Sequence, residues 1–277
     1  MSHYENYSQT AGSYDTTRAA IGAEIWLGHL VETFGDLAKL RVLDAGCGTG
    51  NYMLALAAHV GHVTALDMNE EMLAEARQKA TRAQLDEKIE FVADQMLDLP
   101  FEDGSFDAVM FNQVLHHLDP EEKSGFENLR GAMAEAARVV GNDGLIFINA
   151  CSRVQMQRGY WYYSLIPGAR QRGLDRTIGT QDLKDVLAGL GMGSVSRTVL
   201  LDALLLGEAN FNARGPLDAA WRAGDSIWAL ASDDELAAAL TKIAEMERDG
   251  LLEAYMNDLD DDRRLVGQTT FWCARGS

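Results

Sequence analysis

Hydrophobic positions follow two different spacings over the middle of the chain. Between residues 41 and 150, apolar runs of five to seven residues alternate with longer segments whose apolar positions lie three or four residues apart. A short apolar run predicts a strand buried on both faces, and the longer spacing predicts an amphipathic helix. Strands and helices in alternation predict a parallel sheet with helices on both faces.

The individual elements of this region can be assigned from the same pattern. Gly141 follows the last expected helix and provides its stop signal, and Glu70 and Glu71 stand in a first helical turn, where the dipole favours acids. The expected strands are Arg41–Ala45, His62–Asp67, Ile89–Ala93, Phe106–Phe111 and Gly144–Ala150, and the expected helices are Asn51–His59, Glu70–Arg82 and Glu127–Val140.

The pattern beyond residue 150 is less regular. A helix is expected at Thr180–Leu190, with Thr180 as its N-cap, and strands are expected at Val195–Leu201 and Thr269–Ala274. Residues 207–265 form a polar, helical excursion between these two strands. Within it, Ser232 and Glu235 have the spacing of a capping box ahead of a helix over 236–246.

Composition restricts the partners of the protein. The chain has 277 residues, 47% of them hydrophobic, and a formal net charge of −18. Such a charge repels a phosphate backbone, so we expect no nucleic-acid partner. The one short basic cluster, Arg170, Arg172 and Arg176, is interpreted as solvated. No apolar run reaches the roughly 18 residues that span a bilayer, so no membrane association is expected.

Cysteine usage indicates a reducing compartment. Cys47, Cys151 and Cys273 are widely separated and odd in number, and no Cys/His pair has metal-ligand spacing. Neither a disulfide framework nor a metal site is therefore predicted. No signal peptide is visible at the N-terminus, and we expect a cytoplasmic protein. The acidic run 258–262 lacks the central glycine of a calcium loop and is interpreted as a solvated turn.

The segment Val42-Leu43-Asp44-Ala45-Gly46-Cys47-Gly48-Thr49-Gly50 carries the strongest chemical signal. An apolar strand ends there in an acid and three alternating glycines, and a helix follows directly. Glycines let the backbone pass beneath a ligand without obstruction by side chains. Asp67, at the end of the next strand, stands where a carboxylate can accept both hydroxyls of a ribose. Together these residues predict a nucleoside pocket.

The glycine spacing argues against a dinucleotide. The dinucleotide fingerprint is G-x-G-x-x-G, whereas this loop reads G-x-G-x-G and has Asn51 in place of the last glycine. Asp44, just before the loop, disfavours a polyanion and suits a cationic ligand. S-adenosylmethionine (SAM) has a sulfonium and an ammonium group and no phosphate. At this motif the chain resembles the class I, Rossmann-like SAM-dependent methyltransferases of small molecules.

The resemblance covers residues 40–150 and implies a set of cofactor-binding residues. Gly46 and Gly48 would lie under the methionine part of SAM, and Asp44 near its ammonium group. Asp67 would hold the ribose, with Met68 against the adenine. Asp94 would receive the adenine amino group beside Gln95, and Asn112 would contribute backbone contacts. Asp94 has an alternative interpretation as a turn or helix-capping residue.

The same family resemblance extends to the N-terminus and to a histidine pair. Tyr7 and Tyr14 lie seven residues apart in a Y-x-x-x-A-x-x-Y-D pattern similar to a lid helix, and Arg18 follows one turn later. The resemblance implies that these residues contact SAM and that Tyr14 acts in catalysis. His117, after His116, would lie on the acceptor side as a base. Packing roles remain open for all of them.

An aromatic cluster follows the fifth strand. The run Tyr160-Trp161-Tyr162-Tyr163 falls where the family builds its acceptor cavity, so Tyr160 and Trp161 are candidate substrate-binding residues. Anchoring of a cap to the body is the alternative role. The family also ends its sheet with an antiparallel hairpin, for which 195–201 and 269–274 would supply the strands.

These observations predict a single α/β domain, with a doubly wound, mostly parallel seven-stranded sheet, an antiparallel C-terminal hairpin and helical insertions. Residues 40–150 would bind SAM, and 1–40, 151–179 and 207–265 would form a cap. The expected activity is methyl transfer from SAM to an O, N, S or C nucleophile of a small molecule, by a monomer or homodimer. The alternatives are a SAM- or nucleoside-binding sensor without turnover and a protein methyltransferase.

Overall fold

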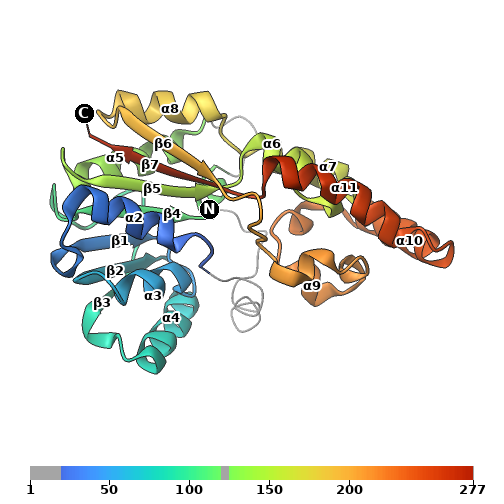
Figure 1. Ribbon diagram of the computed structural model, residues 1–277, viewed down its shortest axis with the longest axis horizontal. Coiled ribbons are helices and arrows are strands. Elements are labelled where there is room, and N and C mark those ends of the chain that lie inside the picture. Colours follow the sequence, from blue (N-terminus) through green and yellow to red (C-terminus); the bar gives the residue numbers. More distant parts are fainter. Residues whose placement is uncertain (1–19, 120–124, 277) are drawn as a thin grey trace.

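The computed structural model describes residues 20–119 and 125–276. Its centre is a seven-stranded sheet in the order β3-β2-β1-β4-β5-β7-β6 (Figure 1). The five N-terminal strands are parallel, and β7 runs antiparallel to both β5 and β6. The strands are β1 (Arg41–Ala45), β2 (His62–Asp67), β3 (Ile89–Ala93), β4 (Ala108–Asn112), β5 (Leu145–Ala150), β6 (Ser194–Val199) and β7 (Thr270–Arg275).

Helices cover both faces of this sheet. The helices α2 (Ala23–Phe34), α3 (Asn51–Ala57) and α4 (Glu70–Ala83) pack on one face, and α5 (Glu127–Val140) and α8 (Thr180–Gly189) pack on the other. The predicted doubly wound sheet with its antiparallel C-terminal pair is therefore confirmed.

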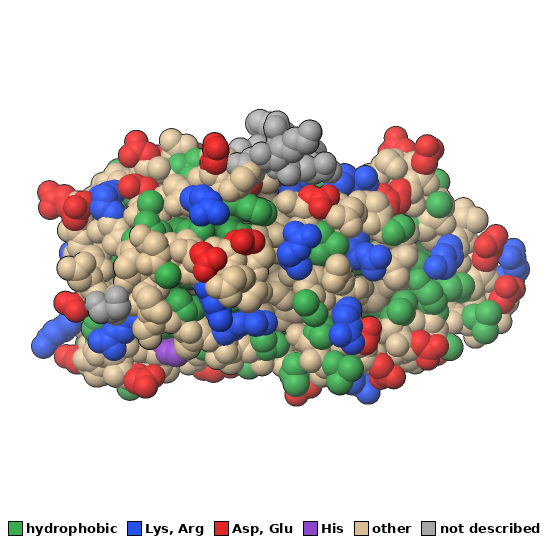
Figure 2. Space-filling view, turned by 90° about the horizontal axis from the view of Figure 1, so that it is seen from above, with side chains coloured by type: hydrophobic (Ala, Val, Ile, Leu, Met, Phe, Trp, Pro, Cys, Tyr) green, Lys and Arg blue, Asp and Glu red, His purple; other side chains and the backbone are tan. Residues whose placement is uncertain are grey.

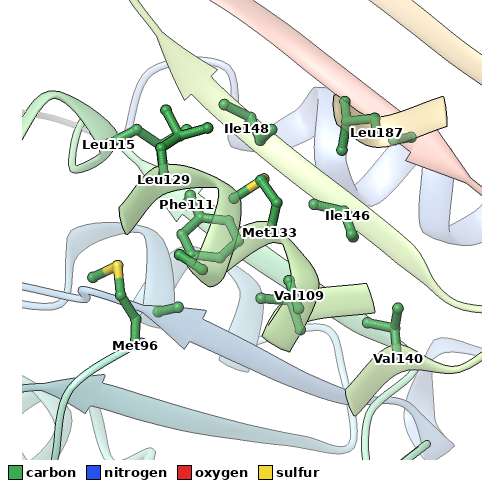
Figure 3. Packing of buried hydrophobic residues seen from close by; sticks show 14 of the residues in the cluster. Met96, Val109, Phe111, Leu115, Leu129, Met133, Val140, Ile146, Ile148 and Leu187 are labelled. Carbon is green, nitrogen blue, oxygen red and sulfur yellow. The ribbon is translucent and has the colours of Figure 1, made fainter. Parts of the chain in front are cut away.

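Strict alternation along the strands explains this two-sided burial. In β4, Met110 faces the helices α2–α4, whereas Val109 and Phe111 face α5. Strand β5 repeats the pattern, because Ile146 and Ile148 point toward α5, where Figure 3 shows them beside its Met133 and near Leu187 of α8. Successive strand side chains point to opposite faces, so a continuous apolar run can fill both cores.

A third apolar core lies beyond the strand ends, in the cap. It is built from α6 (Arg153–Arg158), α7 (Pro167–Asp175), α9 (Ala219–Ala223), α10 (Asp233–Arg248) and α11 (Leu252–Val266), with short 3₁₀ turns between them. Figure 1 shows these helices to one side of the sheet, with α10 and α11 extending away from it. The excursion of residues 207–265 thus folds with residues 151–175 as one unit.

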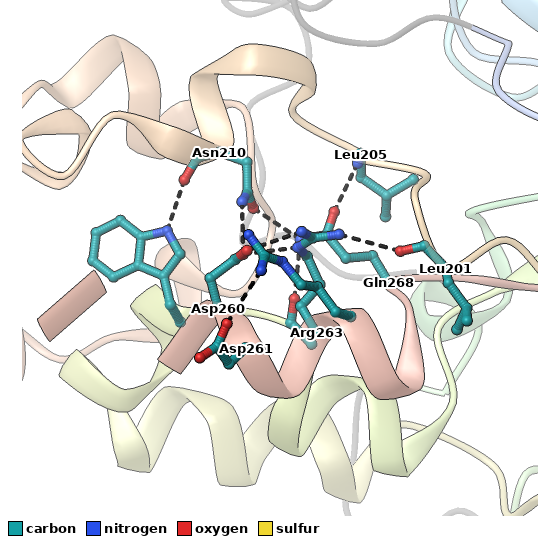
Figure 4. Close-up of polar contacts among 10 residues, drawn as sticks. Leu201, Leu205, Asn210, Asp260, Asp261, Arg263 and Gln268 are labelled. Atoms are coloured by element: carbon teal, nitrogen blue, oxygen red, sulfur yellow. Dashed lines mark hydrogen bonds and ion pairs between the residues drawn. The ribbon is translucent and has the colours of Figure 1, made fainter. Parts of the chain in front are cut away.

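A buried polar network holds the cap against the start of β7 (Figure 4). The guanidinium of Arg263 donates to both carboxylate oxygens of Asp260, at 2.7 and 2.9 Å. Asn210 Nδ2 donates to Asp260 Oδ1, and Gln268 Nε2 donates to Asn210 Oδ1 at 2.8 Å. Gln268 Oε1 in turn accepts from the backbone N–H of Leu205. A buried ion pair requires such additional partners, and this network joins residues 205–210 to residues 260–268.

Most predicted boundaries agree with the structure, but two capping predictions do not. Gly179, and not Thr180, is the N-cap of α8, and a Cβ at Gly179 would lie 2.5 Å from Asp182 Oδ2. Ser232 does cap α10 by accepting from the backbone N–H of Glu235. The carboxylate of Glu235, however, accepts from backbone N–H groups at the start of α7, so the predicted box is only half formed.

A complete capping box exists elsewhere, at the start of α6. The Ser152 side chain accepts from the backbone N–H of Gln155, and the Gln155 side chain accepts from that of Ser152. Among the arginines expected to be solvated, Arg172 donates to Glu235 Oε2 at 2.7 Å and Arg176 is half-buried. The cluster is therefore partly solvated and not in a loop: Arg172 lies in α7 with its side chain 39% exposed, and Arg176 is the C-cap of that helix.

Candidate functional site

The predicted nucleoside loop lies at the carboxyl end of β1, where the strand order reverses between β1 and β4. In open α/β sheets this is the usual position of a ligand crevice. Gly46, Gly48 and Gly50 all have left-handed φ angles, of 80°, 53° and 80°. The loop closes on the neighbouring strand, since the backbone N–H of Gly46 and that of Cys47 donate to the Leu66 carbonyl.

Asp67 connects this loop with the end of β2. Its Oδ2 accepts from the backbone N–H of Gly48 at 2.8 Å, and its Oδ1 accepts from that of Asn69 at 2.9 Å. Burial raises the pKa of the carboxyl group, and these backbone donors lower it in part. Each carboxylate oxygen retains a further acceptor site, as contact with two ribose hydroxyls requires.

Asp44 lies at the base of the loop and is 1% exposed. Neither carboxylate oxygen has a hydrogen-bond donor of good geometry among the described residues. Burial, with a contribution from Asp67, raises its pKa to about 7, although the amide of Asn112 lies close enough to oppose the shift. A buried carboxylate without a strong partner is suited to a cationic ligand such as an ammonium group, so the residues present fit SAM.

Asn112, the last residue of β4, faces the same region. Its Oδ1 accepts from the indole N–H of Trp26 at 3.2 Å, which orients the amide. Its Nδ2 is buried without a hydrogen-bond acceptor among the described residues. Asp44 and Asn112 therefore form one polar pair at the ends of adjacent strands β1 and β4.

The residues predicted to surround adenine border the same edge of the sheet. Met68, directly after β2, is 51% exposed, which is unusual for so large an apolar side chain. Asp94 follows β3, and its backbone N–H donates to the Asp67 carbonyl at 3.2 Å. Its side chain accepts from the backbone N–H of Gln95, whose own side chain is exposed. Tyr7, Tyr14 and Arg18 lie outside the described residues.

A separate cavity of about 80 Å³ opens where the cap meets the ends of β4 and β5. Part of its wall comes from the sheet and part from the cap. Its apolar wall includes Leu115, Leu129, Met156, Leu183, Leu205 and Trp272, and its polar wall includes Gln113, His116, Tyr160, Arg176, Asp225 and Ser226. An apolar pocket with a few convergent polar groups is the usual form of a small-molecule site.

The aromatic run divides between this cavity and the cap core. Tyr160 lines the cavity, and its hydroxyl donates to the Gln268 carbonyl at 2.7 Å. Trp161 does not line it; the side chain is 2% exposed within the cap, and its indole N–H donates to the Asn210 carbonyl at 2.7 Å. Tyr160 therefore lies on the cavity wall, whereas Trp161 packs within the cap.

The histidine pair divides in a similar way. His116 lines the cavity, with Nε2 3.4 Å from the Ser226 hydroxyl. His117 is absent from the cavity wall formed by the described residues, and its ring lies against His116 with centroids 3.9 Å apart. Sequence reasoning named His117 as the catalytic histidine, whereas the geometry favours its neighbour.

Asp225 is a cavity residue that the sequence did not indicate. It is 6% exposed, and its carboxylate accepts from the Tyr163 hydroxyl at 2.8 Å and from that of Tyr162 at 3.3 Å. Burial and the nearby carboxylate raise the pKa of Tyr163 well above its usual value, so its hydroxyl remains a donor. Gln113 was also missed, although its position beside Asn112 at a strand end offered a signal, and Arg176 was noted only as part of a basic cluster interpreted as solvated.

Comparisons with known proteins identify the core of the chain. A family model described as a methyltransferase domain matches residues 43–148. A demethylmenaquinone methyltransferase of Clavibacter sepedonicus is 31% identical over 137 residues, which are 48% of this chain and 54% of that protein. Its counterpart in Porphyromonas gingivalis is 29% identical over 167 residues, 57% of this chain and 65% of the relative. The chain thus spans about half to two thirds of the relatives that it matches.

Solved structures extend the similarity of fold through the cap. A protein of Anabaena variabilis, described as a "putative methyltransferase from antibiotic biosynthesis pathway", matches with a TM-score of 0.71 and 21% identity, over 90% of this chain and 96% of its own. A geranyl diphosphate C-methyltransferase of Streptomyces coelicolor, solved with S-adenosylhomocysteine (SAH), matches with a TM-score of 0.51 and 15% identity, over 92% and 76%.

Proposed function

Since the chain belongs to the class I, Rossmann-like SAM-dependent methyltransferases, we propose that it transfers a methyl group from SAM to a small molecule held in the cavity between sheet and cap. The observation that carries this proposal is the adjacency of two sites at one sheet edge. Asn112 ends β4 beside Asp44, and the next residue, Gln113, lines the cavity.

The donor side is supported by the fit of the loop residues to SAM. Asp67 would accept the ribose hydroxyls, because its carboxylate is already oriented by two backbone N–H groups. Asp44 would pair with the ammonium group, and Met68 would lie against the adenine, with Asp94 and Gln95 at its polar edge. Tyr7, Tyr14 and Arg18 remain proposed contacts from the N-terminal segment.

Little acid–base chemistry is required of the protein. When bound, SAM supplies a methyl group on a sulfonium; the lone pair of the acceptor forms the new bond to carbon as the C–S bond breaks, leaving neutral SAH. The protein aligns the two reactants and excludes water. His116, on the cavity wall, is the proposed recipient of any proton that the acceptor releases, in place of His117.

The proposal extends to the organisation and partners of the protein. We propose one domain in which residues 151–179 and 207–265 form the cap. Of the segment 1–40, also expected in the cap, residues 23–34 form α2 and pack on the sheet instead. We further propose a monomer or homodimer that acts in the cytoplasm on neither nucleic acids nor membranes. Cys47, Cys151 and Cys273 are all free thiols, as a reducing compartment allows. On the face in Figure 2, Lys and Arg side chains are interspersed with acidic ones. No helix in the described part of the chain is long and apolar enough to cross a bilayer.

Calorimetry with SAM, followed by an assay of SAH release, tests this function. The acceptor panel consists of small phenols, amines, thiols and enols. We expect micromolar SAM binding and SAH release that depends on one acceptor class. Folded protein that binds no SAM contradicts the donor site, and SAM binding without turnover on any class favours the alternative of a sensor.

A further inference from the structure

Gln113 has a strained backbone at the junction of the two proposed sites. Its φ angle is 55°, in the left-handed region, and only Gln84 and Phe126 share this among the non-glycine residues that the structure describes. The backbone N–H of Gln113 donates to the Asn149 carbonyl at 2.8 Å, which holds the turn. Residues kept in such conformations cluster at active sites, where they fix a side chain in place.

A chain of hydrogen bonds fixes the orientation of the Gln113 amide. Its Nε2 donates to Asn149 Oδ1 at 3.0 Å and to Thr269 Oγ1 at 2.8 Å. Asn149 Nδ2 donates to the Tyr52 hydroxyl at 2.7 Å, and that hydroxyl donates to the Ile21 carbonyl at 2.7 Å. A carbonyl oxygen can only accept, so the Tyr52 hydroxyl must donate to Ile21 and accept from the Asn149 amide nitrogen. This leaves Asn149 Oδ1 facing Gln113 as an acceptor, so the Gln113 amide nitrogen must face it and the amide cannot flip.

This arrangement leaves Gln113 Oε1 as an acceptor. The two acceptors of Gln113 Nε2, Asn149 Oδ1 and Thr269 Oγ1, are hydrogen-bonded to each other and lie on the same side of the amide nitrogen, and no donor among the described residues bonds to Oε1. The residue lines the cavity together with Leu115, Tyr160 and Trp272, whose side chains are mostly apolar there. An acceptor fixed at an apolar wall discriminates between ligands by whether they present a hydrogen-bond donor.

We propose that Gln113 is a positioning and specificity residue, whose Oε1 accepts a hydrogen bond from an O–H or N–H group of the methyl acceptor. The proposal rests on the proposed function for the identity of the cavity. It narrows the acceptor to a mostly apolar molecule that presents a hydrogen-bond donor to the cavity wall. If Gln113 had only a structural role, its Nε2 would make the same hydrogen bonds, but Oε1 would have no role.

Binding of two probes of similar size, phenol and toluene, distinguishes these possibilities. Both are titrated into wild type and the near-isosteric variant Gln113→Met in the presence of SAH, with binding followed by NMR. We expect the ratio of phenol affinity to toluene affinity to fall about threefold to tenfold in the variant, the range of one neutral hydrogen bond. An unchanged ratio overturns the proposal.

Gln84→Met is the matched control, because Gln84 has a similar φ of 58° at the exposed end of α4, away from the cavity. Its ratio should equal that of wild type, and a comparable fall in this variant also overturns the proposal. If Gln113→Met does not fold, Gln113→Glu keeps an acceptor oxygen without the amide donors. This variant should still prefer phenol over toluene at least as strongly as wild type, and loss of the preference counts against the role of Oε1.

The probe measurement does not depend on turnover. If no methyl transfer is found but Gln113→Met still lowers the ratio of phenol affinity to toluene affinity, the proposed function is rejected. The cavity would then remain a site that selects ligands with a hydrogen-bond donor. Methyl transfer with no Gln113 effect would support the proposed function and reject this assignment.

Discussion

The proposed SAM site at the sheet edge (Asp44, Gly46, Gly48, Asp67 and Asn112), called the donor edge below, and the acceptor cavity between sheet and cap are built in different ways. The donor edge comes from strand ends and one glycine loop, and its contacts join backbone N–H groups to carboxylates, as in the pairing of Gly48 with Asp67. The cavity draws on residues between 113 and 272, and its contacts join side chains across the cap, as in the pairing of Tyr163 with Asp225. One site is local in sequence, and the other depends on tertiary packing.

This difference shows which part of the molecule can vary. The donor edge requires left-handed glycines and acids at strand ends, so few residue types can replace them. The cavity wall requires only shape and a few polar groups, which many sequences can supply. Substitutions at the donor edge should therefore affect SAM binding, whereas substitutions in the cap should affect the acceptor.

Asp67→Ala should have the largest effect. The change removes the acceptor of two backbone N–H groups and the proposed partner of the ribose. We expect SAM affinity to fall about 100-fold or more, since bonds to a charged group contribute about 1.5–3 kcal/mol each. Calorimetry measures this loss. The exposed Asp98→Ala is the control, and an affinity within about twofold of wild type for Asp67→Ala would contradict the donor site.

Gly46→Ala and Gly48→Ala separate folding from binding within one loop. A Cβ at Gly46 would lie 2.7 Å from Val114 Cγ2 and 2.9 Å from Met96 Cε, whereas no atom lies within 4 Å of a Cβ at Gly48. Both positions have left-handed φ angles. We expect about 3 kcal/mol of destabilisation for Gly46→Ala and about 1 kcal/mol for Gly48→Ala, from overpacking and backbone strain.

Stability and SAM affinity should respond differently to the change at Gly48. Gly48→Ala should retain most of its stability in denaturant unfolding but lose SAM affinity, because its methyl group projects into the open donor site. Wild-type SAM affinity in Gly48→Ala would show that the ligand does not pass over this glycine.

The pH dependence of SAM binding tests Asp44. Its pKa of about 7 in the ligand-free protein means that the carboxyl group is largely protonated at pH 6 and ionised at pH 8. Only the carboxylate attracts an ammonium group, so SAM affinity should rise about tenfold between these pH values. Asp44→Asn should bind SAM more weakly and without this rise, and an equal rise in the variant would assign the titration to another group.

Asp44 should also affect the stability of the ligand-free protein. Because its folded pKa lies above the usual aspartate value of 3.8, the folded state holds a proton that the unfolded state releases between pH 4 and 7. Stability should therefore fall as pH rises through this range, and Asp44→Asn should lose that dependence. Unfolding in urea at pH 5 and pH 8 measures the difference.

The sequence was sufficient for the fold of the donor half. Strands β1, β2 and β3 and helix α5 have the predicted boundaries. Burial on both faces gives β1 and β2 mostly apolar runs, Ile89, Phe91 and Val92 mark the edge strand β3, and a glycine ends the helix. Asp44 and Asp67 could be placed together because the carboxyl ends of adjacent parallel strands meet at one edge. These are short-range patterns that a single segment contains.

The acceptor side could not be predicted in the same way. Tyr160 and Trp161 are neighbours in sequence, yet one lines the cavity and the other is buried in the cap. Nothing in the local pattern distinguishes them, since their roles depend on Gln268 and Asn210, at least 49 residues away. Asp225 was missed for the same reason, because an isolated acid in a polar excursion resembles any solvated residue.

Glu235→Ala tests the cap alone and should have the smallest effect on SAM affinity. The Glu235 carboxylate accepts from the backbone N–H groups of Gly168 and Ala169 and pairs with Arg172 at 2.7 Å, so it stabilises the start of α7 from α10. Loss of this cap should lower stability by about 1–2 kcal/mol. Thermal unfolding measures the change, and Asp234→Ala, an exposed acid in the same first turn of α10, is the matched control.

Because Glu235 holds the start of α7, the Glu235→Ala variant should affect the acceptor cavity and not the SAM site. Segment 167–175 precedes the cavity residue Arg176, so loosening it should weaken acceptor binding and leave SAM affinity within about twofold of wild type. A parallel loss of SAM affinity would mean that cap and donor edge are energetically coupled, and that the distinction between a local donor site and a packed acceptor site fails. Unchanged affinity for both ligands would place α7 outside the acceptor site.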